Sequence, residues 1–324
     1  MPENSSKITI VGSGAIGSTI AYSLLLRSPR LEIVLRNRDE RKAWAKAFDI
    51  SHCVPTRGGS SIRAGSLEDT AGSDIVVVTA GVLPKVDGKR SDVLRDNVAA
   101  YREIIPPLAA RSEHALFIVV TNPIDAMAYA AYRLSLMPAS RVIGSGTLLD
   151  GMRLRKFIAE AYALDPEKVE AWVVGEHGDT MVPLWSGISY AGVPLGEYLR
   201  DRGYDLDAEA KRRILERTKR AGWDIRLAGE HSCYGISFSV VRIIETVLGY
   251  SEGPLAVSSL LSQAFGIRDV FMSLPSRLDR SGLVSNSAPT MSEDEEKALV
   301  ASAIALRRQL DAVDLQLGLP PRAD

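Results

Sequence analysis

The chain has 324 residues, of which 46% are hydrophobic and 24% are charged, the balance of a globular protein that can bury a core. Its 39 basic and 40 acidic residues give a formal charge of -1, which argues against a nucleic-acid-binding protein because such proteins usually carry a basic excess. No apolar run approaches the roughly 18 residues of a membrane span, and the polar N-terminus lacks the features of a signal peptide. Two cysteines cannot form a disulfide framework or a zinc cluster. We therefore expect a cytoplasmic protein with no metal, no membrane partner and no nucleic-acid partner.

In the first half of the chain, short β-branched runs alternate with helical patterns. We expect strands at residues 8–11, 31–35, 74–79 and 115–121, and helices at 15–27 and 40–50. The last two strands are continuous apolar runs, which is typical of strands buried on both faces. Strands of this kind separated by helices predict an α/β fold with a doubly wound parallel sheet.

After about residue 146 the pattern changes. Alternating strands are expected at residues 169–174 and 183–190, amphipathic helices at 208–226 and 239–248, and a last helix at about 292–317. Ser292 and Glu295 form a capping-box pattern at the start of the last helix, and Gly318 is a typical stop signal. We expect an α+β substrate or catalytic domain over 147–324 that follows a dinucleotide-binding domain over 1–146, with a cleft between them.

The dinucleotide-binding assignment rests on the motif that follows the first strand and opens the first helix. In this motif Gly12 allows a tight turn, Gly14 lets the backbone approach a pyrophosphate, and Gly17 lets the helix pack closely on the strand. Ala15 and Ile16 begin the helix, whose first N–H groups would face the phosphates. The motif stands in the strand–turn–helix context of a Rossmann domain.

The end of the second strand bears on the choice between NAD and NADP. Asn37 stands where an NAD-binding chain usually has an acidic residue for the ribose hydroxyls, and Arg36 and Arg38 flank it. The absence of a carboxylate removes repulsion of a 2′-phosphate, and an arginine can bind that phosphate with two hydrogen bonds. NADP is therefore favoured, with NAD as the alternative. In that alternative the arginines pair with Asp39, Glu40 or solvent, or Asp39 binds the ribose in a shifted register.

Three further segments carry chemically suitable residues. Residues 80–92 form a long polar connection that suits a mobile lid, and its first residues, Ala80 and Gly81, are expected to contact the cofactor. Asp150 and Arg153 are three residues apart on one expected helix, so they share a helical face. His177 lies between two glycines in a tight loop after a strand.

With the motifs GSGAIG, TNPID, GSGTLLD-x-x-R and GEHG in this order, the sequence resembles the L-lactate/malate dehydrogenase family of NAD(P)-dependent 2-hydroxy-acid dehydrogenases. The resemblance implies that His177 is the acid–base residue and that Asp150 orients it. It also implies that Arg153 binds the substrate carboxylate and that Arg90, on the lid, polarises the substrate carbonyl.

The same resemblance assigns residues around the nicotinamide. Asn122 matches a residue that touches both the nicotinamide and the substrate, and Ser145 matches a serine near the nicotinamide. Relatives are usually dimers or tetramers, so a homodimer or homotetramer is expected, acting on a small 2-oxo or 2-hydroxy acid.

Two positions differ from those of the relatives. Pro84, six residues before Arg90, stands where lactate enzymes have glutamine and malate enzymes have arginine. The Pro84 side chain has neither a hydrogen-bond donor nor a charge. In the alternative of a shifted register, Lys85 points inward and supplies a cation. Ser232 matches a pocket-lining position and leaves room, and His231 beside it reaches in or faces solvent. Both positions favour a substrate other than plain lactate or malate.

Three functions are carried forward. The first is an NADPH-favouring 2-oxo-acid reductase with His177 as the acid–base residue. The second is a malate or lactate dehydrogenase with an unusual lid. The third, of another class, is a catalytically silent cofactor-binding regulatory protein.

Overall fold

The computed structural model describes residues 5–28, 30–54, 59–82, 90–262 and 265–320. Within these residues the main feature is a nine-stranded sheet. Its strands are β1 (Ser6–Val11), β2 (Leu31–Arg36), β3 (Ser61–Ala64), β4 (Ile75–Val78), β5 (Leu116–Val119), β6 (Val142–Gly144), β12 (Leu255–Leu261), β13 (Val270–Asp279) and β14 (Gly282–Asn286).

The order of the strands is that of a doubly wound sheet with an antiparallel extension. From one edge to the other it is β3-β2-β1-β4-β5-β6-β12-β13-β14. The first six strands are parallel, and β12 pairs antiparallel with β6. The parallel part has the strand order of a Rossmann domain. The predicted α/β class, with a Rossmann sheet followed by an α+β part, is confirmed.

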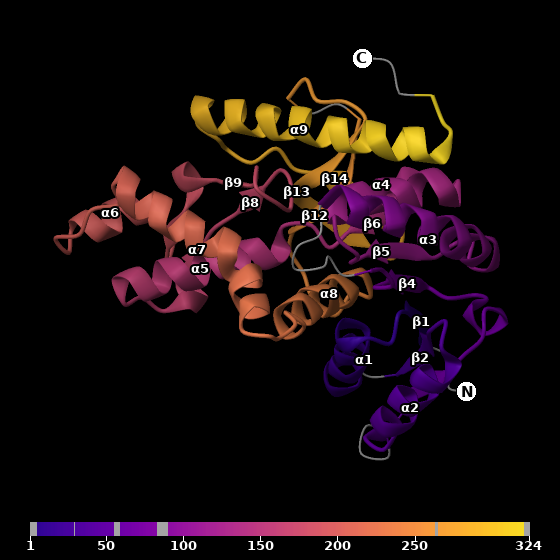
Figure 1. The fold of residues 1–324 in the computed structure, drawn as a ribbon. Helices are drawn as coiled ribbons and strands as arrows, with labels where there is room; N and C mark the ends of the chain where they lie inside the picture. The colour runs from indigo at the N-terminus through magenta and orange to yellow at the C-terminus, as the bar shows by residue number, and fades with distance from the viewer. Residues whose placement is uncertain (1–4, 29, 55–58, 83–89, 263–264, 321–324) are drawn as a thin grey trace.

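Helices cover both faces of the sheet. The helices of the described residues are α1 (Ala15–Arg27), α2 (Glu40–Ser51), α3 (Arg90–Arg111), α4 (Ile124–Ser135), α5 (Leu148–Tyr162), α6 (Leu195–Arg200), α7 (Ala208–Leu227), α8 (Tyr234–Val247) and α9 (Glu293–Leu317), of which α5, α6 and α7 lie away from the sheet. In Figure 1, α3, α4 and α9 lie together above the sheet, while α1 and α8 lie together below it with α2 beside them.

The apolar strands explain why both faces are covered. In β4, Val76 and Val78 belong to the core shared with α3, α4 and α9, whereas Ile75 and Val77 belong to the core shared with α1 and α8. Successive side chains of a strand point to opposite faces, so a continuous apolar run fills two cores at once.

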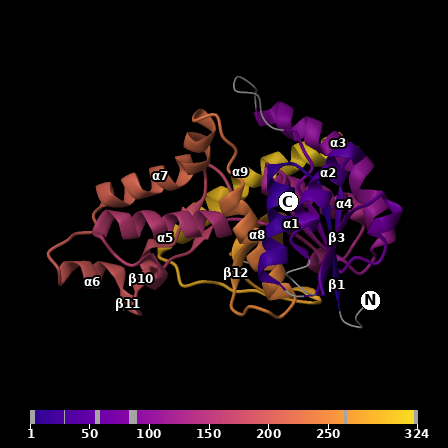
Figure 2. The same cartoon turned by 90° about the horizontal axis from the view of Figure 1, so that it is seen from below.

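A third core forms away from the sheet. Helices α5, α6 and α7 pack around Leu154, Ile158 and Leu199 and extend to one side of the molecule (Figure 2). The remaining short elements are the strands β7 (Val169–Glu170), β8 (Val173–Val174), β9 (Val182–Pro183), β10 (Ser189–Tyr190) and β11 (Val193–Pro194), and the 3₁₀ turns η2 (Glu68–Thr70), η3 (Ala139–Arg141), η4 (Pro166–Lys168) and η5 (Trp185–Gly187). The two alternating runs expected as single strands are therefore each divided into shorter pieces.

The ends of α9 follow the predicted signals. The Ser292 side chain accepts a hydrogen bond from the Glu295 N–H group, and the Glu295 carboxylate accepts one from the Ser292 N–H group. Gly318 ends the helix in the left-handed conformation, with φ of 71°. Helix α8 instead begins at Tyr234, five residues earlier than expected. Ser232 therefore lies just before the first turn of this helix.

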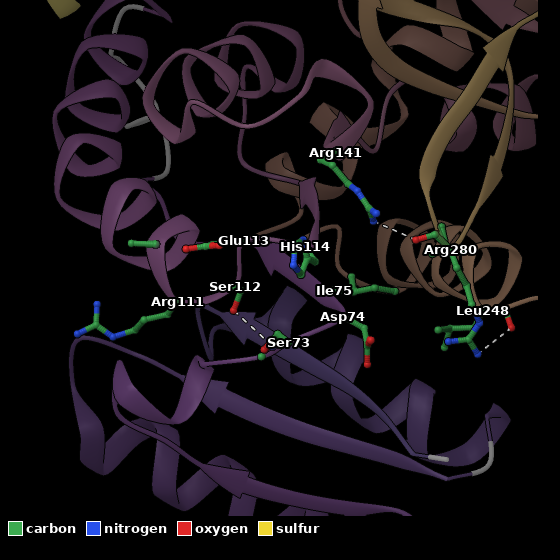
Figure 3. Close-up of a pocket in the computed structure, with 13 residues that line it drawn as sticks. Ser73, Asp74, Ile75, Arg111, Ser112, Glu113, His114, Arg141, Leu248 and Arg280 are labelled. Carbon is green, nitrogen blue, oxygen red and sulfur yellow. Dashed lines mark hydrogen bonds between the residues drawn. The ribbon is translucent and has the colours of Figure 1, made fainter. Parts of the chain in front are cut away.

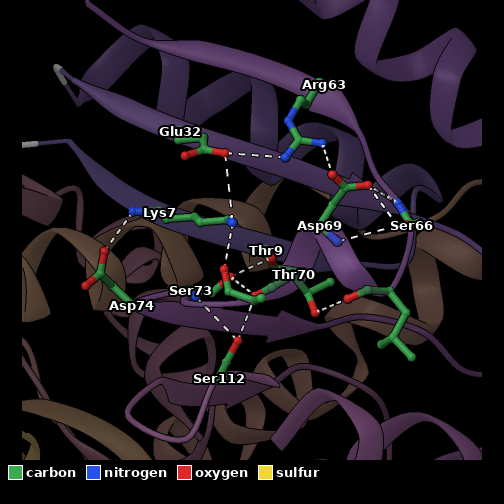
Figure 4. Close-up of polar contacts among 12 residues, drawn as sticks. Lys7, Thr9, Glu32, Arg63, Ser66, Asp69, Thr70, Ser73, Asp74 and Ser112 are labelled. Atoms are coloured by element: carbon green, nitrogen blue, oxygen red, sulfur yellow. Dashed lines mark hydrogen bonds and ion pairs between the residues drawn. The ribbon is translucent and has the colours of Figure 1, made fainter. Parts of the chain in front are cut away.

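A polar network joins the amino-terminal parts of β1, β2 and β3 (Figure 4). Lys7 lies 4.0 Å from Glu32, which lies 3.5 Å from Arg63, and Arg63 lies 2.6 Å from Asp69. One charged side chain from each strand, Lys7, Glu32 and Arg63, thus belongs to a single network. None of the helices in the described ranges has the length and apolar character needed to cross a membrane.

Candidate active site

The carboxyl ends of the parallel strands bring the predicted cofactor residues to one edge of the sheet. Gly12 follows β1, Asn37 follows β2, Gly81 comes three residues after β4, and Asn122 and Ser145 follow β5 and β6. In doubly wound sheets this edge is where ligands bind, because the strand order reverses there and leaves a crevice.

The three glycines of the first loop have the environments that a dinucleotide needs. Gly12 has a φ of +112°, which side chains rarely adopt, and a Cβ atom on Gly17 would lie 1.8 Å from the Gly12 carbonyl oxygen. A Cβ atom on Gly14 would meet nothing within 4 Å, so this side of the loop is open. Gly14 also caps α1 without a side-chain hydrogen bond, which leaves the first N–H groups of the helix for another acceptor. The loop fits a bound pyrophosphate.

Asn37 lies against this loop. Its Nδ2 atom donates to the Ser13 hydroxyl over 2.7 Å, and its Oδ1 atom accepts from the Asp39 N–H group over 3.1 Å. The Asp39 carboxylate instead caps α2, accepting from the Lys42 N–H group over 3.3 Å. Asn37 is therefore the side chain of this segment that is in contact with the glycine loop.

The two arginines beside Asn37 are unpaired in the described part of the chain. Arg36 is partly buried at the end of β2, Arg38 is exposed, and neither forms an ion pair with an acidic side chain of the described residues. The pairing with Asp39 or Glu40 that was the alternative to a phosphate-binding role is not present there.

The start of the lid is fixed to the neighbouring strand end. The Thr121 hydroxyl donates to the Ala80 carbonyl oxygen over 2.8 Å. The buried Asn97 side chain accepts from the Val82 N–H group over 2.7 Å and donates to the Asn122 carbonyl oxygen over 2.8 Å. Asn97 thus connects the lid to the segment expected to touch the nicotinamide.

The lid residues expected to contact the substrate fall outside the described part of the chain. Pro84 and Lys85 lie outside the described residues. Arg90 is the first residue of α3, and its side chain also lies outside the described part.

His177, Asp150 and Arg153 lie together. The His177 Nδ1 atom is 2.5 Å from Asp150 Oδ2, and Arg153 Nη1 is 3.3 Å from Asp150 Oδ1. Asp150 and Arg153 come from the first turns of α5, while the His177 loop is joined to β13 by hydrogen bonds between Gly175 and Ser273. One carboxylate therefore holds an imidazole and a guanidinium on its two oxygens.

The electrostatics of this cluster favour a protonated imidazole. Burial acts to lower the pKa of His177, but the charge of Asp150 and its hydrogen bond act in the opposite direction, and the pKa of His177 is raised above its ordinary value. The Asp150 side chain is only 1% exposed, whereas that of His177 is 19% exposed. The carboxylate is thus shielded, and the imidazole retains access to the outside.

The facing wall is formed by α7 and the segment before α8. Arg153 Nη2 lies 3.5 Å from the Ser232 hydroxyl, which it reaches as a donor. A Cβ atom on Gly222 would lie 3.3 Å from Arg153 Nη2, so the glycine lets α7 approach the guanidinium. His231 is exposed.

Sequence reasoning missed three residues that take part in this arrangement. These are Asn97, Gly222 and Asp125, whose carboxylate accepts a hydrogen bond from the His177 N–H group over 2.8 Å. Asp125 could have been found because it belongs to the TNPID motif. Asn97 and Gly222 give no local signal, because their roles depend on which helix faces which strand.

Ser145 is fully buried in the turn after β6, and its N–H group donates to the Val119 carbonyl oxygen over 2.8 Å. Its hydroxyl has no partner among the described residues.

A hollow of about 530 Å³ lies at the opposite, amino-terminal edge of the sheet (Figure 3). Arginines line it, but they are engaged: Arg280 donates to the Leu248 carbonyl oxygen at the end of α8, Arg141 donates to the Arg280 carbonyl oxygen, and Arg111 pairs with Glu68. The carboxyl end of a helix carries partial negative charge and repels anions. The hollow therefore suits the phosphates of a dinucleotide less well than the carboxyl edge of the sheet does. Among the described residues, no three His, Cys, Asp or Glu side chains form a group that could hold a metal ion.

Comparisons with known proteins agree with this geometry. Residues 6–144 match the family model of the lactate/malate dehydrogenase NAD-binding domain, and residues 147–315 match that of the lactate/malate dehydrogenase α/β C-terminal domain. The chain belongs to the lactate/malate dehydrogenase family. It is an oxidoreductase of the lactate/malate dehydrogenase type, and its NAD-binding domain is that of a nicotinamide-dependent enzyme.

Individual members of this family are similar over nearly the whole chain. An L-lactate dehydrogenase of Clostridium botulinum is 34% identical over 95% of this chain and 97% of its own length. The crystal structure of a minor L-lactate dehydrogenase from Enterococcus mundtii has a TM-score of 0.90 at 32% identity, covering 95% of this chain and 98% of its own. A malate dehydrogenase from Cryptosporidium parvum has a TM-score of 0.91 at 28% identity, covering 96% and 100%.

Proposed function

We propose that this member of the lactate/malate dehydrogenase family interconverts a 2-oxo acid and an L-2-hydroxy acid, with NADPH as the favoured reductant. The observation that carries the proposal is the shared carboxylate of Asp150, 2.5 Å from His177 Nδ1 and 3.3 Å from Arg153 Nη1. An acid–base group and a carboxylate-binding group thus lie side by side, a short distance from the edge at which the cofactor residues gather.

The side chains of the chain supply the proton and the orientation. Because Nδ1 of His177 faces Asp150, Nε2 is the atom left to donate a proton to the carbonyl oxygen during reduction. Asp150 fixes the ring and stabilises its charged form, and Arg153 binds the substrate carboxylate as a planar fork. Arg90, at the lid, would polarise the carbonyl. A bound nicotinamide would supply the hydride.

The preference for NADPH is supported by the environment of Asn37. The residue that touches the glycine loop is an amide rather than a carboxylate, and Asp39 is engaged at the start of α2. Arg36 and Arg38 carry positive charge next to this position and make no ion pair in the described residues. A 2′-phosphate would find attraction and no nearby repulsion.

The substrate is proposed to differ from plain lactate or malate. Pro84 offers no donor for a small 2-oxo acid and no charge for a second carboxylate. On the facing wall, Ser232 is small and lies 3.5 Å from Arg153, which leaves room beyond the bound carboxylate. A bulkier 2-oxo acid suits both positions.

The second candidate is a lactate or malate dehydrogenase with an unusual lid. The similarity favours it, because the L-lactate dehydrogenase of Clostridium botulinum shares 34% identity over 95% of this chain. A catalytically silent cofactor-binding protein is disfavoured by the His177–Asp150 contact, since a buried carboxylate beside an imidazole is not needed to bind a cofactor.

The test is the initial rate of nicotinamide oxidation with NADPH and NADH, side by side, over a panel of 2-oxo acids. The panel runs from pyruvate and oxaloacetate to branched, aromatic and longer diacid compounds. We expect the highest kcat/KM with NADPH and a bulky acid. An NADH-linked preference for pyruvate or oxaloacetate would establish the second candidate, and saturable cofactor binding without turnover would establish the silent protein.

We also propose a homo-oligomer, a dimer or tetramer. Helices α1, α2 and α8 lie side by side and expose large apolar side chains, among them Tyr22, Trp44, Phe48 and Phe238. A gathering of exposed aromatic side chains on one side of a monomer is typical of a protein–protein interface.

A further inference from the structure

Asp125 is a buried acidic residue beside the acid–base histidine. It is the second residue of α4, only 2% exposed, and its Oδ2 atom accepts a hydrogen bond from the His177 N–H group over 2.8 Å. It is thus a second carboxylate next to His177, on the main-chain side, whereas Asp150 lies on the imidazole side.

Few groups compensate the Asp125 charge. The other oxygen, Oδ1, has no hydrogen-bond partner among the described residues, and neither has the Ser258 hydroxyl of β12. That hydroxyl is still close enough to Asp125 to favour the charged form. The ionisable groups that face Asp125 are His177, which favours its charge, and Glu176, which opposes it.

We propose that Asp125 is a positioning residue that fixes the main chain at His177 and adds a second negative charge beside its imidazolium. The inference deepens the proposed function, because it assumes that His177 is the proton donor. Its chemical content is that His177 is held by two carboxylates from two different helices, Asp150 of α5 at the imidazole and Asp125 of α4 at the main-chain N–H group.

Burying the Asp125 carboxylate costs free energy, which suggests that its charge does more than hold the main chain of the His177 loop. Burial raises the pKa of Asp125 to about 6, so the charged form is disfavoured by its surroundings. A neutral oxygen would accept the His177 N–H bond without that cost. The charge of Asp125 in turn acts to raise the pKa of His177, together with Asp150 and against the charge of Arg153.

The same loop contains a neutral tether for comparison. The Glu176 N–H group, one residue before His177, donates to the Ser302 hydroxyl of α9 over 3.0 Å. Both tethers hold the main chain of the loop, and only the one to Asp125 carries a charge. Ser302→Ala is therefore the matched control for Asp125→Asn, whose amide oxygen can still accept the N–H bond.

The primary readout is the pKa of the His177 imidazole by NMR titration of histidine-labelled protein. The chain has four histidines, so the His177 signal is assigned by its absence from His177→Gln. We expect Asp125→Asn to lower this pKa by about one unit, since an opposite charge within a few ångströms shifts a pKa by roughly 1 to 3 units. Ser302→Ala should leave it in place.

The kinetic readout follows from the same shift. In Asp125→Asn, kcat/KM for reduction should fall about tenfold at a pH above the His177 pKa of both proteins and far less at a pH below both, because one pKa unit changes the protonated fraction tenfold only above both pKa values. Ser302→Ala removes no charge, so any change that it causes in kcat/KM should be the same at both pH values. Ser258→Ala is the second variant, and it should lower the His177 pKa by less than Asp125→Asn does.

The proposal is overturned if the His177 pKa is the same in the wild type, Asp125→Asn and Ser258→Ala. It is also overturned if Ser302→Ala lowers that pKa as much as Asp125→Asn, since a loop effect would then explain both. Failure of the proposed function would look different, because His177→Gln would then retain full activity while the NMR shifts were still seen.

Discussion

At the scale of single residues, Asp150 is central to the proposed chemistry. It is almost completely buried, and its two oxygens face His177 and Arg153. A carboxylate in this place keeps the imidazole protonated at a pH at which a buried histidine would otherwise lose its proton.

The pH dependence of reduction tests this directly. We expect kcat/KM to be constant below the raised pKa of His177 and to fall about tenfold per pH unit above it, because the protonated imidazole is the proton donor. In Asp150→Asn the carboxylate charge is lost and burial remains, so the break in the profile should move to lower pH. A break at unchanged pH in this variant would contradict the role of Asp150.

We predict that the choice between NADPH and NADH also depends on one residue, Asn37. Asn37→Asp puts a carboxylate next to Ser13 and the glycine loop, where it would repel a 2′-phosphate and accept bonds from ribose hydroxyls. We expect the ratio of kcat/KM for NADPH to that for NADH to fall at least about tenfold. Arg41→Ala, which removes a cation from the exposed side of α2, is the control and should leave the ratio within about twofold. An unchanged ratio in Asn37→Asp would count against the preference for NADPH.

Most of these site residues could be predicted from the sequence, and those that could not have an identifiable physical reason. His177, Asp150 and Arg153 belong to local motifs, and their proximity follows from the strand and helix ends that carry them. Asn97 was not predicted, because its contacts join the lid to a segment 25 residues further along the chain. Such a contact depends on packing, which no local pattern encodes.

At the scale of elements, α4 and α9 are joined by a buried charge cluster. Asp314 of α9 is fully buried, 2.6 Å from Arg133 and 2.7 Å from the Tyr129 hydroxyl, and Arg307 lies 3.4 Å away. Since α9 also holds the His177 loop through Ser302, the cluster supports the site from behind.

We expect Asp314→Ala to lower the free energy of unfolding by about 3 to 5 kcal/mol, because it leaves two arginines without their buried counter-charge. Asp311→Ala is the matched control: Asp311 pairs with Arg307 over 2.9 Å but is 44% exposed, so its loss should change stability by no more than about 1 kcal/mol. Denaturant unfolding measures both. Equal effects of the two substitutions would show that burial does not set the energy of this cluster.

The strands of the second half show where element prediction fails. The strands over Leu255–Leu261 and Val270–Asp279 were not predicted, although they complete the large sheet. Their residues are buried on both faces, so they show no alternation of apolar and polar residues, and their neighbour β6 lies far away in the sequence. In the first half, β1, β2, β4 and β5 are each followed by a helix and were predicted, whereas the short strands β3 and β6 were not predicted.

At the scale of the whole molecule, the sheet continues through strands from both halves of the chain, because β12 pairs with β6. The division into residues 1–146 and 147–324 stays a prediction. The site combines the two halves, since Asp125 comes from the first and Asp150 and His177 come from the second.

Assembly is the prediction that belongs to this scale. Trp44 is 58% exposed and stacks on Phe48 at 5.0 Å between ring centroids, on the side of the molecule formed by α1, α2 and α8. If this side is the interface, Trp44→Glu should convert the oligomer to smaller species in sedimentation velocity, because it buries a charge without a partner. Leu315→Glu on α9, where the leucine is 77% exposed, should leave the assembly unchanged. An intact oligomer in Trp44→Glu would place the interface elsewhere.

The most direct single measurement compares wild type and His177→Gln for NADPH oxidation with the best 2-oxo acid of the panel. We predict measurable turnover in the wild type and a loss of about 10² to 10⁴ in kcat for the variant, with NADPH still bound, because only the proton donor is removed. Full activity in His177→Gln would contradict the proposed chemistry, and so would a wild-type protein that oxidises no nicotinamide with any acid.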